Sequence, residues 1–233
     1  MARSALWYVR ISLAGVLIVT FGTADAPAQT THNDVGGWAS FFVAVPIGNE
    51  LEVRADSILQ VTNDVSWVGW ELARVIVLRT LKDHLAVGGG YTVFRIGNGT
   101  GGHSVEHRAV QELDVRMPIR TDTLVISLRT RLEERRREQQ PGTAFRLRQQ
   151  ARLDVQLDTR GVRAVAWNEY FFSINGTAWS GRSGPSLMLN FVGVHVPVTK
   201  RTAIEPGYLN QTIFVVGRNP ILHVAALFVT AHL

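Results

Sequence analysis

Cysteine is absent from this sequence of 233 residues. No disulfide can therefore stabilise the fold, although exported bacterial proteins often contain them, and metal sites built on thiolates are excluded. The seven histidines do not make up for this lack, so we predict no structural metal. The glycine-rich segment 88–102 lacks the Lys-Ser/Thr of a phosphate-binding loop and any strand–helix context, so we predict no cofactor.

Long hydrophobic runs are also missing from most of the chain. No segment after the first few dozen residues has the roughly 18 continuous apolar residues of a transmembrane helix. The one early run, 11–22, follows two arginines and precedes the small-residue sequence APA (26–28). Because this run is too short to span a bilayer, we predict a cleaved signal peptide at 1–28 and one domain at 29–233. An uncleaved membrane anchor is the alternative.

Charge of a single sign is lacking as well. Lysine and arginine number 24 against 19 aspartates and glutamates, which gives a net charge of +5. A nucleic-acid surface needs a clustered patch of one sign, whereas the arginines here alternate with acidic residues. We therefore predict that nucleic acid is not a partner.

Short segments rich in β-branched and aromatic residues recur along the chain instead. They are separated by turn sequences such as PIGN (46–49), LKDH (81–84) and QQPG (139–142). Short and long connections alternate, as they do in many outer-membrane barrels. We predict eleven strands, at 37–45, 50–61, 66–79, 84–95, 104–118, 122–136, 143–157, 162–174, 186–197, 201–215 and 220–233.

Alternation of polar and apolar residues gives each predicted strand one polar face and one apolar face. In segment 143–157 one face is almost wholly apolar, and the other carries Arg146, Arg148, Gln150, Arg152, Asp154 and Gln156. The charged segment LRTRLEERRREQQ (128–140) consists of good helix formers, but it alternates in the same way and has no helical stripe. We therefore predict a strand to about Arg135, with its charges on one face.

This pattern suits a membrane barrel with an apolar exterior, and also a soluble sandwich or a lipocalin-like binding module. Most predicted strands run 11–15 residues, enough for the 9–11 residues that a tilted membrane strand needs. Aromatic residues lie toward strand ends, where membrane-interface girdles form. They are Trp38, Trp67, Trp70, Tyr170, Phe171, Phe172, Trp179 and Phe228.

We therefore expect an all-β protein, an antiparallel transmembrane β-barrel of about 10–12 strands located in the bacterial outer membrane. Its expected partners are outer-membrane lipid and the barrel-assembly machinery. Single-chain bacterial barrels have an even number of strands, which conflicts with eleven. Either a strand is miscounted, so that there are ten or twelve, or residues 29–36 thread through the barrel or pair beside it.

The charged faces predict a network inside the barrel. A two-residue turn at Arg120-Thr121 makes facing residues sum to 241, pairing Glu106 with Arg135, Arg108 with Glu133, and Glu112 with Arg129. A turn at Thr159-Arg160 makes the sum 319 and places Gln150 opposite Glu169, with Arg148 and Arg152 as diagonal neighbours. The candidate site residues are Glu106, Arg108, Glu112, Arg129, Arg131, Glu133, Arg135, Arg148, Arg152 and Glu169. Two interpretations stay open, an architectural network that fixes register and a lining that selects or binds anions.

Several segments resemble an uncharacterised bacterial family, domain of unknown function 2490, regarded as outer-membrane barrels. They are EHRAVQELDV (106–115), LRTRLEERRRE (128–138), FRLRQQARLDVQL (145–157), WNEYFFSING (167–176) and PGYLNQTIF (206–214). The resemblance implies a β-barrel in the outer membrane, and the family has no established activity to transfer. One departure is the final Leu233, where many barrel proteins end in an aromatic residue recognised during assembly.

An outer-membrane enzyme acting on lipid or lipopolysaccharide is the alternative function. It needs a nucleophile and a base, and the nearest candidates are His103, Ser104 and His107. Adjacent residues on a strand point to opposite faces, so His103 and Ser104 form a poor pair. His195 and His223 alternate with apolar residues, which favours a place in the lumen or a girdle. The expected function is therefore an outer-membrane barrel with a charge-paired lumen, either a narrow channel or a structural barrel.

Overall fold

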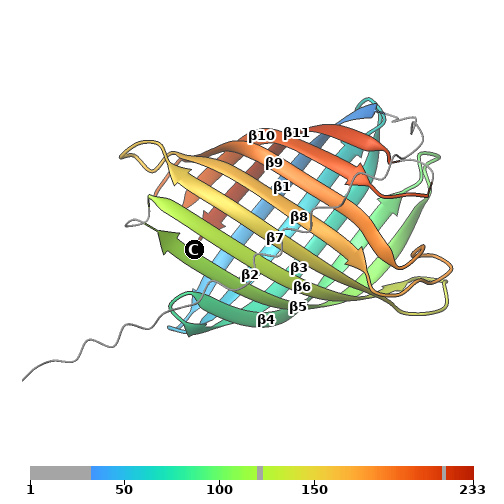
Figure 1. The fold of residues 1–233 in the computed structure, drawn as a ribbon, viewed down its shortest axis with the longest axis horizontal. Helices are drawn as coiled ribbons and strands as arrows, with labels where there is room; N and C mark the ends of the chain where they lie inside the picture. Colours follow the sequence, from blue (N-terminus) through green and yellow to red (C-terminus); the bar gives the residue numbers. More distant parts are fainter. Residues whose placement is uncertain (1–32, 120–122, 217–218) are drawn as a thin grey trace, which may run out of the picture.

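The computed structural model describes residues 33–119, 123–216 and 219–233, and Figure 1 shows its strands running obliquely around one closed wall. The predicted signal peptide at 1–28 and the turn at Arg120-Thr121 lie outside the described residues. The strands are β1 (Asn33–Ile47), β2 (Leu51–Thr62), β3 (Trp67–Lys82), β4 (Leu85–Gly97), β5 (His103–Ile119), β6 (Leu124–Arg137), β7 (Ala144–Gln156), β8 (Arg163–Ser173), β9 (Gly184–Pro197), β10 (Thr202–Ile213) and β11 (Ile221–His232). Each of the eleven predicted segments forms a strand.

Within these ranges, no helix is long enough and apolar enough to cross a membrane.

The barrel closes between its first and last strands. Each strand pairs antiparallel with its neighbour in sequence, whereas β1 pairs with β11 in parallel, from Asn33 opposite Ile221 to Ala44 opposite His232. An odd number of strands makes the first and last run in the same direction, so only a parallel ladder can close the wall. The all-β barrel is confirmed. The described residues form eleven strands, within the expected range of about 10–12, so the alternative of a miscounted strand is wrong. Residues 33–36 pair in the wall as part of β1.

The two ends of the barrel differ in their connections. At the end where β1 finishes, the strands are joined by short turns such as 48–50 and 83–84. We call this the short-turn end. At the other end, the long-loop end, the connections include 174–183 between β8 and β9, which is the longest in the described chain. The alternation of short and long connections predicted from sequence is therefore present.

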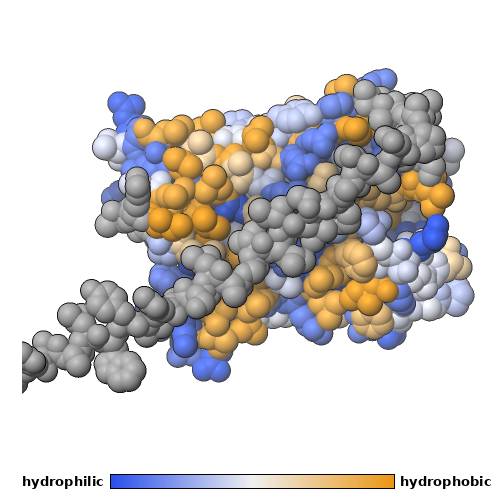
Figure 2. Space-filling model, viewed as in Figure 1, coloured by the Kyte–Doolittle hydropathy of each residue, from blue (hydrophilic) through white to orange (hydrophobic). Residues whose placement is uncertain are grey.

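Side chains alternate between the two faces of the wall as predicted. On β6, Leu128 and Leu132 point outward, whereas Arg131 and Glu133 are buried in the lumen. Exposed apolar side chains cover the outside, among them Val75, Val77, Leu147, Leu153 and Val192. Figure 2 shows broad patches of hydrophobic side chains on the visible face of the wall, with hydrophilic side chains toward its rims.

The inner face has an apolar half and a charged half. One buried cluster spans β1 and β8–β11 and consists of Trp38, Val165, Phe171, Leu187, Leu189, Phe191, Leu209, Leu222, Val224 and Ala226. The charged half is concentrated on β5 to β8, with further charged side chains on β2 and β3. Five aromatics predicted for membrane girdles line the lumen instead, namely Trp38, Trp70, Phe171, Trp179 and Phe228. The girdle prediction is wrong for these five because position along the chain does not fix the direction in which a side chain points.

Two glycines of β4 bring β3 and β4 unusually close. A Cβ atom on Gly88 would lie 2.0 Å from the Val77 carbonyl oxygen, and one on Gly90 would lie 2.1 Å from that of Val75. A side chain at either position would collide with backbone, which agrees with the close strand contact expected for the GGG sequence. Both glycines face the lumen, where they leave space next to the charged half.

Candidate functional site

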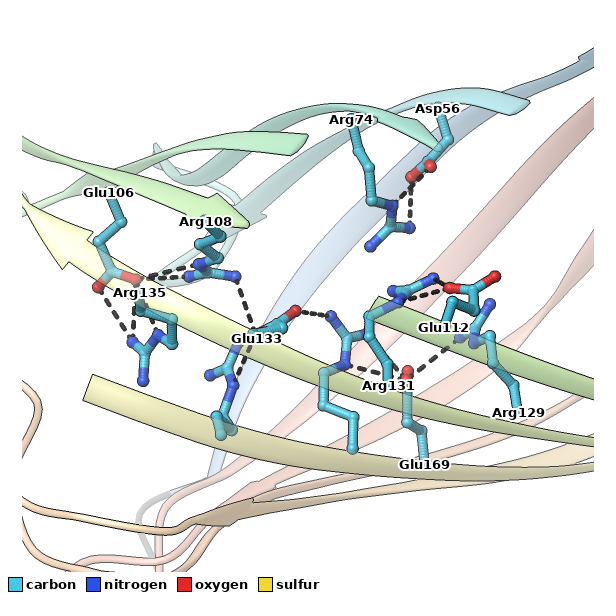
Figure 3. A network of polar contacts seen from close by, with 12 residues as sticks. Asp56, Arg74, Glu106, Arg108, Glu112, Arg129, Arg131, Glu133, Arg135 and Glu169 are labelled. Carbon is cyan, nitrogen blue, oxygen red and sulfur yellow. Dashed lines mark hydrogen bonds and ion pairs between the residues drawn. The ribbon is translucent and has the colours of Figure 1, made fainter. Parts of the chain in front are cut away.

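All ten candidate residues named from sequence face the lumen. Nine of them line its central cavity, and Glu133 is fully buried in the network behind that lining. They come from only four neighbouring strands, β5 to β8, and most of them from β5, β6 and β7, whose inner faces are rich in charged residues. Three glutamates act as the centres around which the arginines gather (Figure 3).

Glu106 on β5 is the centre nearest the long-loop end. Its carboxylate is 2.8 Å from Arg108, 2.9 Å from Arg135 and 2.8 Å from Arg137. Arg135 and Arg137 also lie over the ring of Trp179, which belongs to the long loop 174–183. The network is thus anchored to the rim of the barrel.

Glu133 on β6 is the middle one of the three glutamate centres, between Glu106 and Glu169. It accepts hydrogen bonds from Arg146 at 2.6 Å and from Arg148 at 2.7 Å, and Arg108 lies 3.8 Å away. Arg148 reaches onward to Glu169 at 2.9 Å, and Glu169 also receives Arg129 at 3.2 Å. One chain of ion pairs therefore runs along the charged wall from Glu106 to Glu169.

The hairpin of β5 and β6 is shifted by two residues from its predicted register. Glu106 lies opposite Arg137 and Glu112 opposite Arg131, so that facing residues sum to 243. Two of the predicted pairs survive as diagonal contacts, Glu106 with Arg135 and Arg108 with Glu133. The third prediction is wrong, since Glu112 forms its ion pair with Arg131 and not with Arg129. A shift of two keeps every charge on the inner face, so alternation alone cannot detect it.

The hairpin of β7 and β8 has the predicted register, with Gln150 opposite Glu169. Arg148 pairs with Glu169 as expected, but Arg152 turns toward the short-turn end. There it binds Asp154 at 2.8 Å and Glu205 of β10 at 2.6 Å. His195 also contacts Glu205, at 2.8 Å, so His195 belongs to the lumen.

A second polar group was missed by the choice of candidate residues. Arg74 of β3 donates from Nε and Nη2 to both oxygens of Asp56 on β2, at 2.8 and 2.7 Å. Arg54 of β2 reaches Asp114 of β5 at 2.5 Å and lies 3.6 Å from Glu112. The alternation of segment 50–61 marks Asp56 and Arg54 as one face, whereas Arg74 stands between Leu72 and Ile76 on an otherwise apolar face.

An aromatic wall lines the lumen beside the charges, and the Arg108 guanidinium lies 4.0 Å from the centre of the Phe94 ring. Trp38 packs edge-on against Trp70, with ring centres 6.0 Å apart, and Trp70 packs against Phe94 at 5.5 Å. A second group on the same side joins Trp167, Phe191 and Phe228. The prediction of membrane girdles is wrong for three of these rings, Trp38, Trp70 and Phe228, which it assigned to the lipid interface.

The lumen contains a cavity of about 810 Å³. Its lining runs from Trp179 and Ser180 at the long-loop end to His232 at the short-turn end, so it extends along most of the barrel. Among the described residues in the lining, the arginines are Arg54, Arg74, Arg108, Arg116, Arg129, Arg131, Arg135, Arg137, Arg146, Arg148, Arg152 and Arg163. Six carboxylates share the lining, and three more, those of Glu52, Asp114 and Glu133, pair with lining arginines. Leaving Arg116 and Arg163 aside, ten guanidiniums and nine carboxylates share this interior.

Some of the guanidinium groups have nitrogen atoms to spare. Within the described part of the chain, no hydrogen-bond acceptor reaches Nη1 of Arg74, Nη1 of Arg131 or Nε of Arg129. All three atoms are buried, and a buried donor without an acceptor costs about 1–3 kcal/mol. These atoms are therefore the places where the lumen can receive an anionic group.

The residues proposed for an enzyme do not come together. His103 and Ser104 point to opposite faces of β5, and His103 contacts Arg95 on the outside. His107, also outward, bonds the Tyr91 hydroxyl at 2.7 Å and Glu138 at 2.9 Å. His103 and His107 have the His-x-x-x-His spacing that would suit metal binding on a helix, but here they lie in a strand. His223 is likewise outside, where it bonds Tyr208.

The fold and this interior define a class, the closed β-barrel with an apolar exterior and a charge-paired lumen. The chain belongs to the family described as protein of unknown function (DUF2490), whose profile matches residues 35–221. An uncharacterized protein of Methylorubrum extorquens is 31% identical over 218 residues, which covers 88% of this chain and 89% of the relative.

A solved structure also overlaps with the barrel, that of the siderophore receptor PirA from Pseudomonas aeruginosa. It is 12% identical and superposes with a TM-score of 0.27, and the match covers 82% of this chain but only 42% of the receptor. With so low a score, the overlap adds nothing to the fold that the strand pairing already establishes.

Proposed function

We propose that this protein is an outer-membrane barrel whose lumen passes small anions. The observation that carries the proposal is a cavity that extends along most of the barrel and is lined by more arginines than carboxylates, even when Arg116 and Arg163 are left aside. Rings of charged side chains select the ions that pass a pore, and arginine rings favour anions.

The membrane location rests on the outer surface and the strand lengths. The strands run 11 to 17 residues, which meets the 9–11 residues that a tilted membrane strand requires. Their outward side chains are mostly apolar, and in lipid only a closed sheet satisfies every backbone group. Outer-membrane lipid is then the partner of this surface, the barrel-assembly machinery would insert it, and the signal peptide predicted at 1–28 would export the chain.

Most of the network also has an architectural role. Arg108, Arg146 and Arg148 are almost fully buried and each shares a carboxylate with another arginine. Such pairs hold neighbouring strands in register, because an arginine turned toward the bilayer midplane costs about 2–4 kcal/mol. The guanidinium nitrogens that such pairs leave unused, on Arg74, Arg129 and Arg131, are what would attract anions.

Reversal potentials across a planar bilayer under a potassium chloride gradient test the proposal. Arg137 lies at the long-loop end of the lumen, and its partner Glu106 keeps two other arginines if Arg137 is removed. We expect the wild-type protein to prefer chloride and Arg137→Gln to reduce that preference. The matched control is Arg136→Gln, the next residue, which points outward with 71% of its side chain exposed and should leave selectivity unchanged.

Three outcomes would contradict the proposal. A barrel that conducts no ions is not a passage, and one that prefers potassium has the opposite selectivity. Recovery of the protein only in a soluble periplasmic fraction would contradict the membrane location and favour a soluble binding module.

A further inference from the structure

One region of the lumen presents cations and aromatic rings to the same space. Arg74, Arg129 and Arg131 line the cavity together with Trp38, Trp70 and Phe94. The cations come from β3 and β6, and the rings come from β1, β3 and β4. Figure 3 shows the Arg74 guanidinium pointing from its own strand into the space above Glu112 and Arg131.

The arginines on the polar side of this region have N–H donors that their ion pairs with Asp56 and Glu112 do not use. Arg74 is 8% exposed and gives two of its nitrogens to Asp56, while its Nη1 meets no acceptor among the described residues. Arg131 is 2% exposed, pairs with Glu112 and has the same unused nitrogen. Arg131 also lies in the repulsive field of Arg74 and Arg129. A carboxylate placed here would accept the unused hydrogens and offset that repulsion.

The apolar side stands directly beside it. Trp70, Leu72 and Arg74 follow one another on the inner face of β3, and at about 3.3 Å per residue the Cα atoms of Trp70 and Arg74 are roughly 13 Å apart. The Trp38 and Phe94 rings flank Trp70. A flat ring that carries an acid group spans such a distance once the reach of the arginine side chain is included.

We propose that this region binds an aromatic carboxylate, with its ring against Trp70 and its acid group between Arg74 and Arg131. A carboxylate matches the planar fork of a guanidinium, and aromatic rings pack well edge to face. The cavity volume of about 810 Å³ lies within the range typical of small-molecule sites. The inference deepens the proposed function, since an aromatic carboxylate would be a preferred anion of the same lumen.

Equilibrium dialysis of the full-length barrel in detergent, with 2-naphthoate as the probe and micelles alone as the blank, tests the inference. We expect Arg74→Gln to weaken 2-naphthoate binding about ten-fold or more, the order expected for a lost charge-assisted hydrogen bond. The uncharged analogue 2-naphthylmethanol should bind both proteins about equally. Arg79→Gln is the matched control, since Arg79 lies on the same strand but outside the lumen with 63% of its side chain exposed.

The aromatic contribution has its own pair of variants. Trp70→Leu should weaken both the acid and the alcohol, whereas Trp67→Leu, which changes a ring packed against the glycine loop at the rim, should weaken neither. Arg74→Lys keeps a positive charge opposite Asp56 and should bind 2-naphthoate with an affinity between those of wild type and Arg74→Gln. It tests the role of Arg74 even if Arg74→Gln does not fold.

The inference is overturned if wild-type protein does not retain 2-naphthoate, or if acetate displaces it at equal concentration, because the rings then contribute nothing. Chloride selectivity without naphthoate binding would overturn this inference and leave the proposed passage standing. Naphthoate binding without conductance would overturn the passage alone.

Discussion

Glu133 illustrates, at the scale of single residues, how this barrel keeps charge in its interior. Its carboxylate is fully buried, and three guanidiniums surround it within 3.8 Å. Taking such groups out of water is costly unless each is paired and hydrogen-bonded. Glu106, Glu133 and Glu169 each pair with two or three arginines, so the loss of one of these carboxylates affects several strands at once.

Replacing Glu133 by glutamine should therefore be severe. The change leaves Arg108, Arg146 and Arg148 without their shared counter-charge, and breaking a buried pair costs about 3–5 kcal/mol. We expect the free energy of unfolding to fall by that order in guanidinium titrations of the barrel in lipid vesicles.

The neighbouring Glu134 provides the control. It points outward and pairs with the exposed Arg136, so Glu134→Gln should change stability by at most about 1 kcal/mol. Equal shifts for the two variants would show that the inner network does not hold the barrel together.

At the scale of strands, alternation predicted the faces but left the registers and some orientations open. Segments 128–140 and 143–157 carry charges at every second residue, so their inner faces were readable from sequence alone. The pattern cannot distinguish registers that differ by two residues, because such a slip leaves every side chain on the same face. This explains the shift of two residues in the hairpin of β5 and β6. In β1 the sequence around Trp38 has no charge that marks the inner face, so sequence could not show that this ring points inward.

The close contact between β3 and β4 allows a second test, at Gly90 of β4. A Cβ atom there would lie 2.1 Å from the Val75 carbonyl oxygen and 2.7 Å from the Ile76 Cα atom, so the backbones of β3 and β4 would have to separate. We expect Gly90→Ala to destabilise the barrel by about 1–3 kcal/mol, as overpacking does. The measurement is the temperature at which the folded gel band converts to the unfolded one.

Gly89 on the same strand faces outward and is the matched position. A Cβ atom there would lie 3.2 Å from the Val110 carbonyl oxygen, which a small adjustment can relieve. Gly89→Ala should therefore convert close to the wild-type temperature. If Gly89→Ala destabilised the barrel more than Gly90→Ala, the result would contradict the claim that Gly90 is needed for the close approach of β3 and β4.

For the whole molecule, the number of strands determines how the wall closes. Eleven strands can close only if β1 and β11 run in parallel, whereas an even-stranded barrel would close with an antiparallel pair. The sequence could not decide this, because its turn signals locate the strands but say nothing about which strand lies next to the first. The parallel seam also places the start of β1 at the long-loop end and the end of β11 at the short-turn end.

The absence of cysteine lets engineered disulfides test this seam without interference. Ala39 lies opposite Leu227 and Val43 opposite Ala231, at the spacing of neighbouring strands, about 4.8 Å, which a disulfide can bridge. We expect both double-cysteine variants, Ala39→Cys with Leu227→Cys and Val43→Cys with Ala231→Cys, to cross-link on oxidation and to shift on non-reducing gels. The exchanged combinations, Ala39→Cys with Ala231→Cys and Val43→Cys with Leu227→Cys, place the sulfurs about 13 Å apart along the strand and should stay reduced. An antiparallel seam through this region would give the reverse result, with the exchanged pairs linking together, and would replace the eleven-stranded closure.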